Sequence, residues 1–125
     1  MLFCACGSYP VKNQNNESTS NEEPVVIANE ELQYEIIIID PGFTTYLNTV
    51  ARPEEYYSQT FLEAKNRIYV VVWNNRARNP LSYNNTIYEN IIDYDPNINY
   101  GLEVNYKLYW YFKFAEQKYG MSLNF

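Results

Sequence analysis

One uninterrupted stretch of the chain constrains the fold more than any other feature. Residues 54–79 contain no Gly and no Pro, and they lie between Pro53 and Pro80. Apolar side chains recur there at helical intervals, at Phe61, Leu62, Ile68, Tyr69, Val72 and Trp73. Residues 68–73 (IYVVVW) also have the propensity of a strand. Because no turn signal separates them from their helical flanks, we expect one long helix that begins at Pro53 and ends before Pro80.

A second segment fits two periods. Residues 104–114 alternate between apolar and polar or tyrosine side chains, as a strand does. The same residues also form a wide helical stripe, and the segment ends on Lys118 and Gly120, which is typical of a helix exit. A strand of this length would be unusual. We therefore expect a second long helix, and its many aromatic residues predict burial on more than one side.

The remaining apolar segments are short. Gln33–Ile39 carries four consecutive isoleucines, which predict a central strand buried on both faces. Residues 25–27 fit a short edge strand, residues 87–94 a further strand, and residues 43–50 a short helix after the turn Asp40-Pro41-Gly42. The expected fold class is α+β, with a small two- or three-stranded sheet packed against two longer helices and one short helix.

The N-terminus differs from the body. Both cysteines lie in the opening MLFCACGS, and the small residue before Cys6 is typical of a bacterial lipoprotein signal, in which that cysteine is acylated. The basic region and most of the apolar region of such a signal are missing, so we expect its beginning to precede Met1. Residues 1–6 are then a signal remnant, residues 7–31 a disordered acidic tether, and residues 32–125 a single globular domain.

The distribution of charge excludes several functions. The net charge is -6, and up to residue 35 six Glu residues face the single base Lys12, so the body is almost neutral. Nine scattered Lys and Arg residues do not form the basic patch that nucleic acids require. With no histidine in the chain, Ser-His-Asp catalysis and histidine zinc sites are excluded. We expect no cofactor.

Carboxylates supply the only candidates for catalysis. At the end of a strand, Asp40 could act as a general acid or base together with Asp93 or Glu35. The alternative is that Asp-Pro-Gly only opens a turn. We favour the turn, since no histidine, lysine or second carboxylate is near Asp40 in the sequence.

A possible metal loop follows the expected strand. Asp93, Asp95 and Asn97 place oxygen side chains at alternate positions, as a calcium loop does. Ile98 stands where such a loop has its turn glycine, and Val104 stands at the twelfth position, which needs a glutamate. A proline turn followed by a helix cap explains the segment better, so we expect no metal site.

The fourteen tyrosines are the chain's most unusual feature. Exposed Tyr, Trp and Arg side chains favour sugar stacking or protein contacts. We expect most of the aromatic residues to be core. The candidates for a binding surface are Tyr56, Tyr57, Arg76, Tyr109 and Trp110.

Several strings of the body look familiar. YEIIIIDPGF, ARPEEYYSQTFLEAKNRIYV, WNNR and IDYDPNINYGLEVNYKLY resemble a family of short Gram-negative bacterial lipoproteins known only as a domain of unknown function. The resemblance runs from about Pro24 to the C-terminus. It implies acylation at Cys6 and assigns no catalytic residue.

Together these observations predict a lipoprotein of the cell envelope. It would be anchored to the membrane through Cys6 and face the periplasm or the cell surface. We expect a non-catalytic binding or adaptor module whose partner is an envelope protein or a glycan, since a small anchored module more often recruits than catalyses. The alternative is a small histidine-free hydrolase that acts on envelope glycans with a carboxylate pair.

Overall fold

The computed structural model describes residues 24–124. The elements follow the order β1 (Val25–Asn29), η3 (Glu30–Leu32), β2 (Tyr34–Ile38), α1 (Phe43–Thr49), η4 (Glu54–Tyr56), α2 (Gln59–Ala77) and α3 (Leu102–Tyr119). The strands form one antiparallel hairpin, so the fold class is α+β, as predicted. Both long helices and the short helix are confirmed, including the two segments whose period was ambiguous.

The short edge strand expected at residues 25–27 is confirmed as β1, so the folded domain begins before the boundary at residue 32 that the sequence indicated. We placed residues up to 31 in a disordered tether, but β1 pairs with β2 in a register that sets Ile27 opposite Ile36. Ile27 is fully buried, so β1 belongs to the core. The acidic pair that made this region resemble a tether lies in the single turn η3 between the strands. The folded domain therefore starts by Val25, and residues 7–23 lie outside the described residues.

Helix α1 follows a tight turn. The backbone N–H of Phe43 donates to the carbonyl of Asp40 at 3.1 Å, with Pro41 and Gly42 between them. Gly42 has a φ of 96°, which is the left-handed conformation that the third position of a type II turn requires. The predicted turn is confirmed, and it directs the chain from β2 into α1.

Helix α2 starts later than expected. Pro53 and the two glutamates after it form only the short turn η4, and the α-helix begins at Gln59. Ser58 is the N-cap, because its hydroxyl accepts a hydrogen bond from the backbone N–H of Phe61 at 3.1 Å. A side chain that accepts a hydrogen bond from a free N–H of the first turn favours the start of an α-helix more strongly than a proline alone does.

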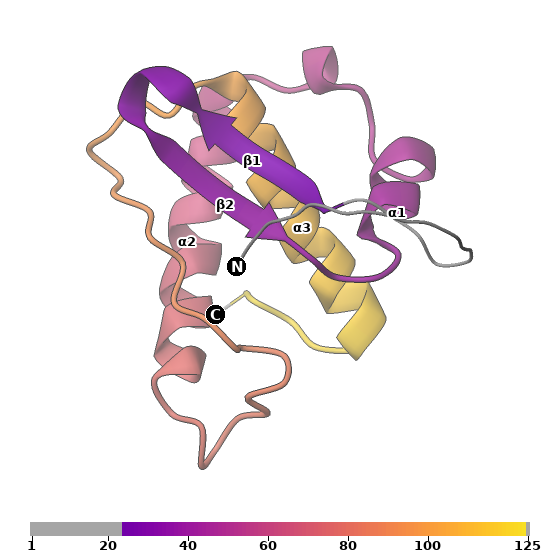
Figure 1. Cartoon of the computed structure of the whole chain (residues 1–125), viewed down its shortest axis with the longest axis vertical. Helices are drawn as coiled ribbons and strands as arrows, with labels where there is room; N and C mark the ends of the chain where they lie inside the picture. The colour runs from indigo at the N-terminus through magenta and orange to yellow at the C-terminus, as the bar shows by residue number, and fades with distance from the viewer. Residues whose placement is uncertain (1–23, 125) are drawn as a thin grey trace, which may run out of the picture.

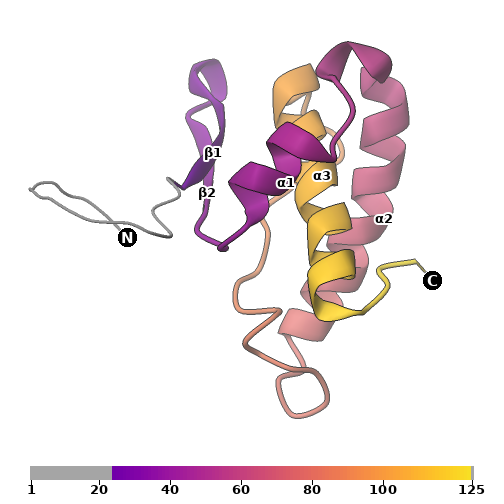
Figure 2. The same ribbon diagram turned by 90° about the vertical axis from the view of Figure 1, so that its right-hand side faces the viewer.

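Helix α3 is the central layer. Figure 2 shows the hairpin on one side of α3 and α2 on the other, and α1 also packs against α3. Residues 108–112 of α3 are all buried, which is possible only for a helix covered on most of its circumference. The predicted burial on more than one side is confirmed.

Residues 87–94 form no strand. Ile87 and Tyr88 close a turn on the carbonyl of Asn84, and the backbone after this turn, which we call the extended segment, runs past α2 and the hairpin without regular secondary structure, shown in orange in Figure 1. Side chains of α2 take the place of a neighbouring strand as hydrogen-bond partners of this segment. A sequence pattern can indicate an extended backbone, but it cannot show which groups satisfy that backbone.

Strand β2 is not buried on both faces. Its exposure alternates along the strand, with Tyr34, Ile36 and Ile38 packed against the core. Ile37 remains 48% exposed and Ile39, just after the strand, 73%. The prediction failed because only one face of the two-stranded sheet has a helix against it within residues 24–124.

Candidate functional site

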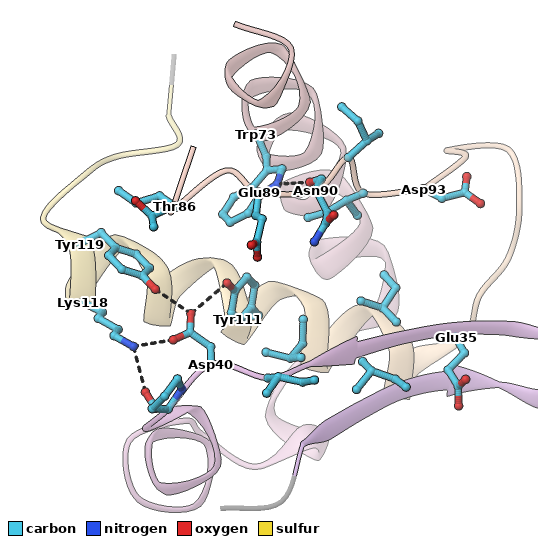
Figure 3. Close-up of a pocket in the computed structure, with 18 residues that line it drawn as sticks. Glu35, Asp40, Trp73, Thr86, Glu89, Asn90, Asp93, Tyr111, Lys118 and Tyr119 are labelled. Atoms are coloured by element: carbon cyan, nitrogen blue, oxygen red, sulfur yellow. Dashed lines mark hydrogen bonds and ion pairs between the residues drawn. The ribbon is translucent and has the colours of Figure 1, made fainter. Parts of the chain in front are cut away.

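A groove of about 560 Å³ lies between the hairpin and the extended segment. One wall is β2 with its continuation to Pro41, and the other wall is residues 86–93, as Figure 3 shows. Between the two walls, side chains of α2 and α3 also line it: Trp73, Tyr111, Lys118 and Tyr119. We call it the β2 groove. Its volume falls in the range of about 300–1,000 Å³ that is usual for ligand sites.

The wall formed by residues 86–93 is fastened to α2. Asn74 acts as a surrogate strand, because its amide nitrogen donates to the carbonyl of Ile92 at 2.9 Å and its amide oxygen accepts the N–H of Ile92 at 2.8 Å. Trp73 donates its indole N–H to the carbonyl of Asn90 at 2.9 Å. Both side chains are buried, so the wall is held from behind.

One end of the β2 groove is closed by a tyrosine. The hydroxyl of Tyr34 donates to the backbone carbonyl of Asp93 at 2.5 Å, which joins the first residue of β2 to the opposite wall. The ring of Tyr34 packs on Tyr100 with the ring centroids 4.4 Å apart. Burial, and then the nearby Tyr100 and Asp93, raise the pKa of Tyr34 far above its usual range, so the hydroxyl keeps its proton.

The other end is organised by Asp40. One carboxylate oxygen accepts hydrogen bonds from the hydroxyls of Tyr111 at 3.1 Å and Tyr119 at 3.0 Å. The second oxygen forms an ion pair with Lys118 (Figure 3). Asp40 therefore fastens the end of β2 to the last turns of α3. The residue does more than open a turn, which is all that we expected of it.

The surroundings of the three donors, Tyr111, Tyr119 and Lys118, keep them protonated at neutral pH. Burial, followed by the charge and hydrogen bond of Asp40, raises the pKa of Tyr111 far above its usual range. The same causes raise the pKa of Tyr119. Partial burial lowers the pKa of Lys118, but the bond to Asp40 and its charge outweigh that effect, so the net shift is upward. Asp40 thus faces protonated donors on three sides.

The structure does not bring the two catalytic candidates together. Asp93 lies at the Tyr34 end of β2 and Asp40 beyond the other end, and the strand between them spans about 13 Å. Figure 3 shows them at opposite ends of the groove, with the Asp93 carboxylate directed away from Asp40. Glu35, the other candidate partner, is exposed at the Asp93 end. A glycosidase pair needs about 5 to 10 Å between its carboxyl groups.

Three carboxylates of the β2 groove carry open negative charge. Glu35, Glu89 and Asp93 are exposed, and no ion pair neutralises them within residues 24–124. Figure 3 shows the Glu89 side chain pointing into the groove toward α3. Among residues 24–124, the only cation that lines the groove is Lys118, which is already paired with Asp40. The groove therefore presents an acidic rim over an aromatic floor.

Sequence reasoning missed Glu89 and the α3 partners of Asp40. A signal for the latter exists, since Tyr111, Lys118 and Tyr119 lie seven and eight residues apart and share one helix face. Their common acceptor is more than 70 residues away in the chain, however, and no local pattern connects them.

The predicted aromatic binding surface is largely core. Tyr109 and Trp110 are each only 8% exposed, because they lie on the helix that is covered by both neighbouring layers. The prediction of exposure is wrong for these two residues. Half-buried Tyr57 packs its ring on both, at 5.8 and 6.1 Å between centroids. Tyr56 is 62% exposed and lies beneath the guanidinium of Arg52 at 4.7 Å.

Arg76 belongs to a different region. It lies in the last turn of α2, while Tyr56 and Tyr57 precede the first turn. Its guanidinium donates to the hydroxyl of Tyr88 at 2.8 Å and stacks over the Tyr83 ring at 5.4 Å. Arg76 therefore fixes the loop after α2 and does not share a surface with the other candidates.

The possible calcium loop is a backbone turn. The Asp95 side chain accepts the N–H of Asn97 at 2.8 Å, and the Asp95 carbonyl accepts the N–H of Ile98 at 3.0 Å. Within the described part of the chain, no group of three or more acidic or cysteine side chains is arranged to hold a metal ion. The proposed lipid attachment residue, Cys6, lies outside the described residues. Among the helices of residues 24–124, none is long and apolar enough to cross a bilayer.

A comparison with protein families gives a match over the whole chain. The model of a family of unknown function, DUF6146, matches residues 1–125. The chain belongs to this family. No match was found among curated proteins or among solved structures. Membership in DUF6146 carries no assigned activity, so the chemistry of the β2 groove is the basis for any functional proposal.

Proposed function

We propose that this DUF6146 chain is a non-catalytic binding module of the cell envelope and that the β2 groove is its ligand site. The observation that carries the proposal is the construction of the groove. Both of its walls are fastened by side chains, at Tyr34, Asn74 and Asp40, while its rim keeps three unpaired carboxylates. A rigid, charged hollow of this kind supports recognition, because little ordering is needed when a ligand binds.

The groove chemistry favours binding over hydrolysis. The carboxylate of Asp40 is occupied by three donors from α3, and the carboxylate of Asp93 points away from it. The chain contains no histidine that could relay a proton. No observation on the described residues favours the hydrolase alternative.

The membrane anchor is part of the same proposal. The sequence around Cys6 supports acylation of its sulfur, and residues 7–23 would then connect the lipid to the domain that starts at Val25. The module would face the periplasm or the cell surface. This position makes an envelope protein or a glycan the expected class of partner.

Site-specific cross-linking of the full chain in its native host tests the binding function. A photoreactive amino acid at Ile91, which is exposed on the rim, should give a discrete adduct. The same probe at Asn75 on α2 is the control, and Glu89→Lys in the Ile91-labelled chain should abolish the adduct. If position 91 gives no adduct above the control and a glycan array is silent, the β2 groove is not a ligand site.

Mass spectrometry tests the anchor. The mature protein from the native host should begin at an acylated Cys6, and a Cys6→Ser chain should remain unprocessed. A mature protein that retains residues before Cys6 without acylation would refute the anchor. This result would leave the groove proposal unaffected.

A further inference from the structure

We propose that the β2 groove receives an extended basic peptide, which pairs with the free edge of β2 as an added strand. The inference rests on the proposed binding function and specifies both its partner class and its mode. It follows from three features of the groove: an unpaired strand edge, an opposite wall that cannot close, and an uncompensated negative charge.

The free edge lies along the groove. Because β1 and β2 pair antiparallel, alternate residues of β2 direct their N–H and C=O groups away from β1. Within residues 24–124 the sheet has no third strand, and no backbone hydrogen bond leaves β2 on the groove side. Edges of this kind are templates for another extended chain.

The opposite wall of the groove, residues 86–93, cannot pair with the free edge of β2. The backbone of Ile92 is paired with Asn74, and the carbonyl of Asn90 is paired with Trp73, so this wall is held toward α2. Tyr34 joins the two walls only at one end. An added strand would lie about 4.8 Å from β2, and the volume of about 560 Å³ is available for it.

Charge selects the occupant. Glu35, Glu89 and Asp93 favour a cationic partner, and Lys or Arg at alternate positions of an added strand share one face and can reach Glu89, which points into the groove. A second copy of the chain would bring the same acidic rim against itself. Residues 1–23 fit no better, since they contain three glutamates and one lysine.

The floor and flanks favour a peptide over a glycan. Sugars stack on exposed aromatic faces, but Trp73 is only 4% exposed and Tyr111 only 7%. The exposed apolar groups beside the groove are instead Ile37, Ile39 and Ile91. They can cover the apolar side chains of a paired strand.

Fluorescence anisotropy with the full 125-residue chain tests the proposal. The probe is a labelled peptide of 5 residues with alternating Lys and Val, which matches the 5-residue length of β2. It should bind, and its affinity should fall as salt is added. A peptide with N-methyl groups at alternate residues keeps the charges but cannot donate along one edge, so it should bind about tenfold more weakly or worse.

Matched variants locate the contact. Glu89→Lys should weaken binding of the Lys-Val peptide by about five- to tenfold, whereas Glu55→Lys, an equal charge change on η4, should not. Circular dichroism and the urea midpoint confirm that both variants fold. Binding of a Glu-Val peptide as tight as that of the Lys-Val peptide would overturn the charge argument.

The outcomes separate this inference from the proposed function. Equal affinity for the plain and N-methylated peptides would overturn strand addition but leave the groove as a binding site. No binding of any peptide would overturn the inference, while the cross-linking experiment at Ile91 decides the proposed function by itself. Sedimentation would assign the free edge of β2 to a second copy of the chain if it showed a dimer that persists in Glu89→Lys and that prevents the peptide from binding.

Discussion

Asp40 shows how much one side chain can determine in a small domain. Its carboxylate accepts from two tyrosine hydroxyls and one ammonium group, and its side chain is only 10% exposed. Its bonds connect the end of β2 to α3 across more than 70 residues of sequence. The geometry of the groove therefore depends on an interaction that closes a long loop.

Replacing Asp40 tests this role. Asp40→Ala should lower the free energy of unfolding by about 2 kcal/mol, because the Tyr111 and Tyr119 hydroxyls lose their acceptor and Lys118 loses its ion pair in a partly buried site. Asp40→Asn keeps an acceptor and should cost about half as much. Urea denaturation measures both values. The control Glu103→Ala removes an exposed ion pair and should lower the free energy of unfolding by about 0.5 kcal/mol or less. If Asp40→Ala lowers it no more than this control does, Asp40 does not fasten β2 to α3.

Asn74 provides a second test at the same scale. Its amide satisfies both backbone groups of Ile92, and Asn74→Ala would leave them buried without partners. We expect a loss of about 3 kcal/mol and rapid hydrogen exchange at the Ile92 amide. Asn75→Ala changes an exposed neighbour on the same helix and should stay within about 0.5 kcal/mol of the parent. Protection of Ile92 that survives in Asn74→Ala would show that other groups hold the wall.

At the scale of elements, the start of α2 makes a further prediction. Ser58→Ala removes the cap of the Phe61 N–H and should destabilise the domain by about 1 kcal/mol. Ser58→Asp restores an acceptor at the positive end of the helix and should recover most of that loss. Thr60→Ala, one residue inside the helix, is the control for the loss of a hydroxyl. Melting curves that show equal losses for Ser58→Ala and Thr60→Ala would reject the cap.

The elements also show what the sequence could and could not predict. The long helices were predictable because their apolar periods extend over many residues, and Gly42 and Gly120 mark chain reversals by their own chemistry. The segment 87–94 was not, since its β-branched residues indicate an extended backbone but its partners are side chains of α2. The start of α2 was misplaced because Pro53 gives a strong local signal, while a cap by Ser58 is decided by geometry.

The candidate site was harder to predict than the fold. Asp40 could be singled out by its place after a strand, but its partners are brought to it by the packing of α3. Tyr109 and Trp110 have the composition of a binding surface, and only the three-layer arrangement shows that they are core. Burial is a property of the whole molecule and is not carried by a local pattern.

The whole molecule is an aromatic core between a hairpin and a helix, and its tyrosines should make it sensitive to alkali. An unfolded tyrosine ionises near pH 10. Burial, and then the charges of Glu63 and Tyr100 against the opposing Arg67, raise the pKa of Tyr94 to about 12. Burial also raises the pKa values of Tyr34 and Tyr111 far above their usual range. The unfolded chain therefore loses these protons first as the pH rises.

This order of ionisation fixes the sign of the pH dependence. The contribution of these tyrosines is fully present below about pH 10, and it is lost as the pH rises from there through about 12. The free energy of unfolding should be flat between about pH 7 and 9 and fall steeply above about pH 10. Urea denaturation across this range gives the slope, and ultraviolet absorbance of tyrosinate should rise together with unfolding. Tyr94→Phe removes one ionising hydroxyl and should reduce the slope of the free energy of unfolding against pH. If this free energy stays flat to about pH 11 while the tyrosines ionise, ionisation of the buried hydroxyls is not coupled to unfolding.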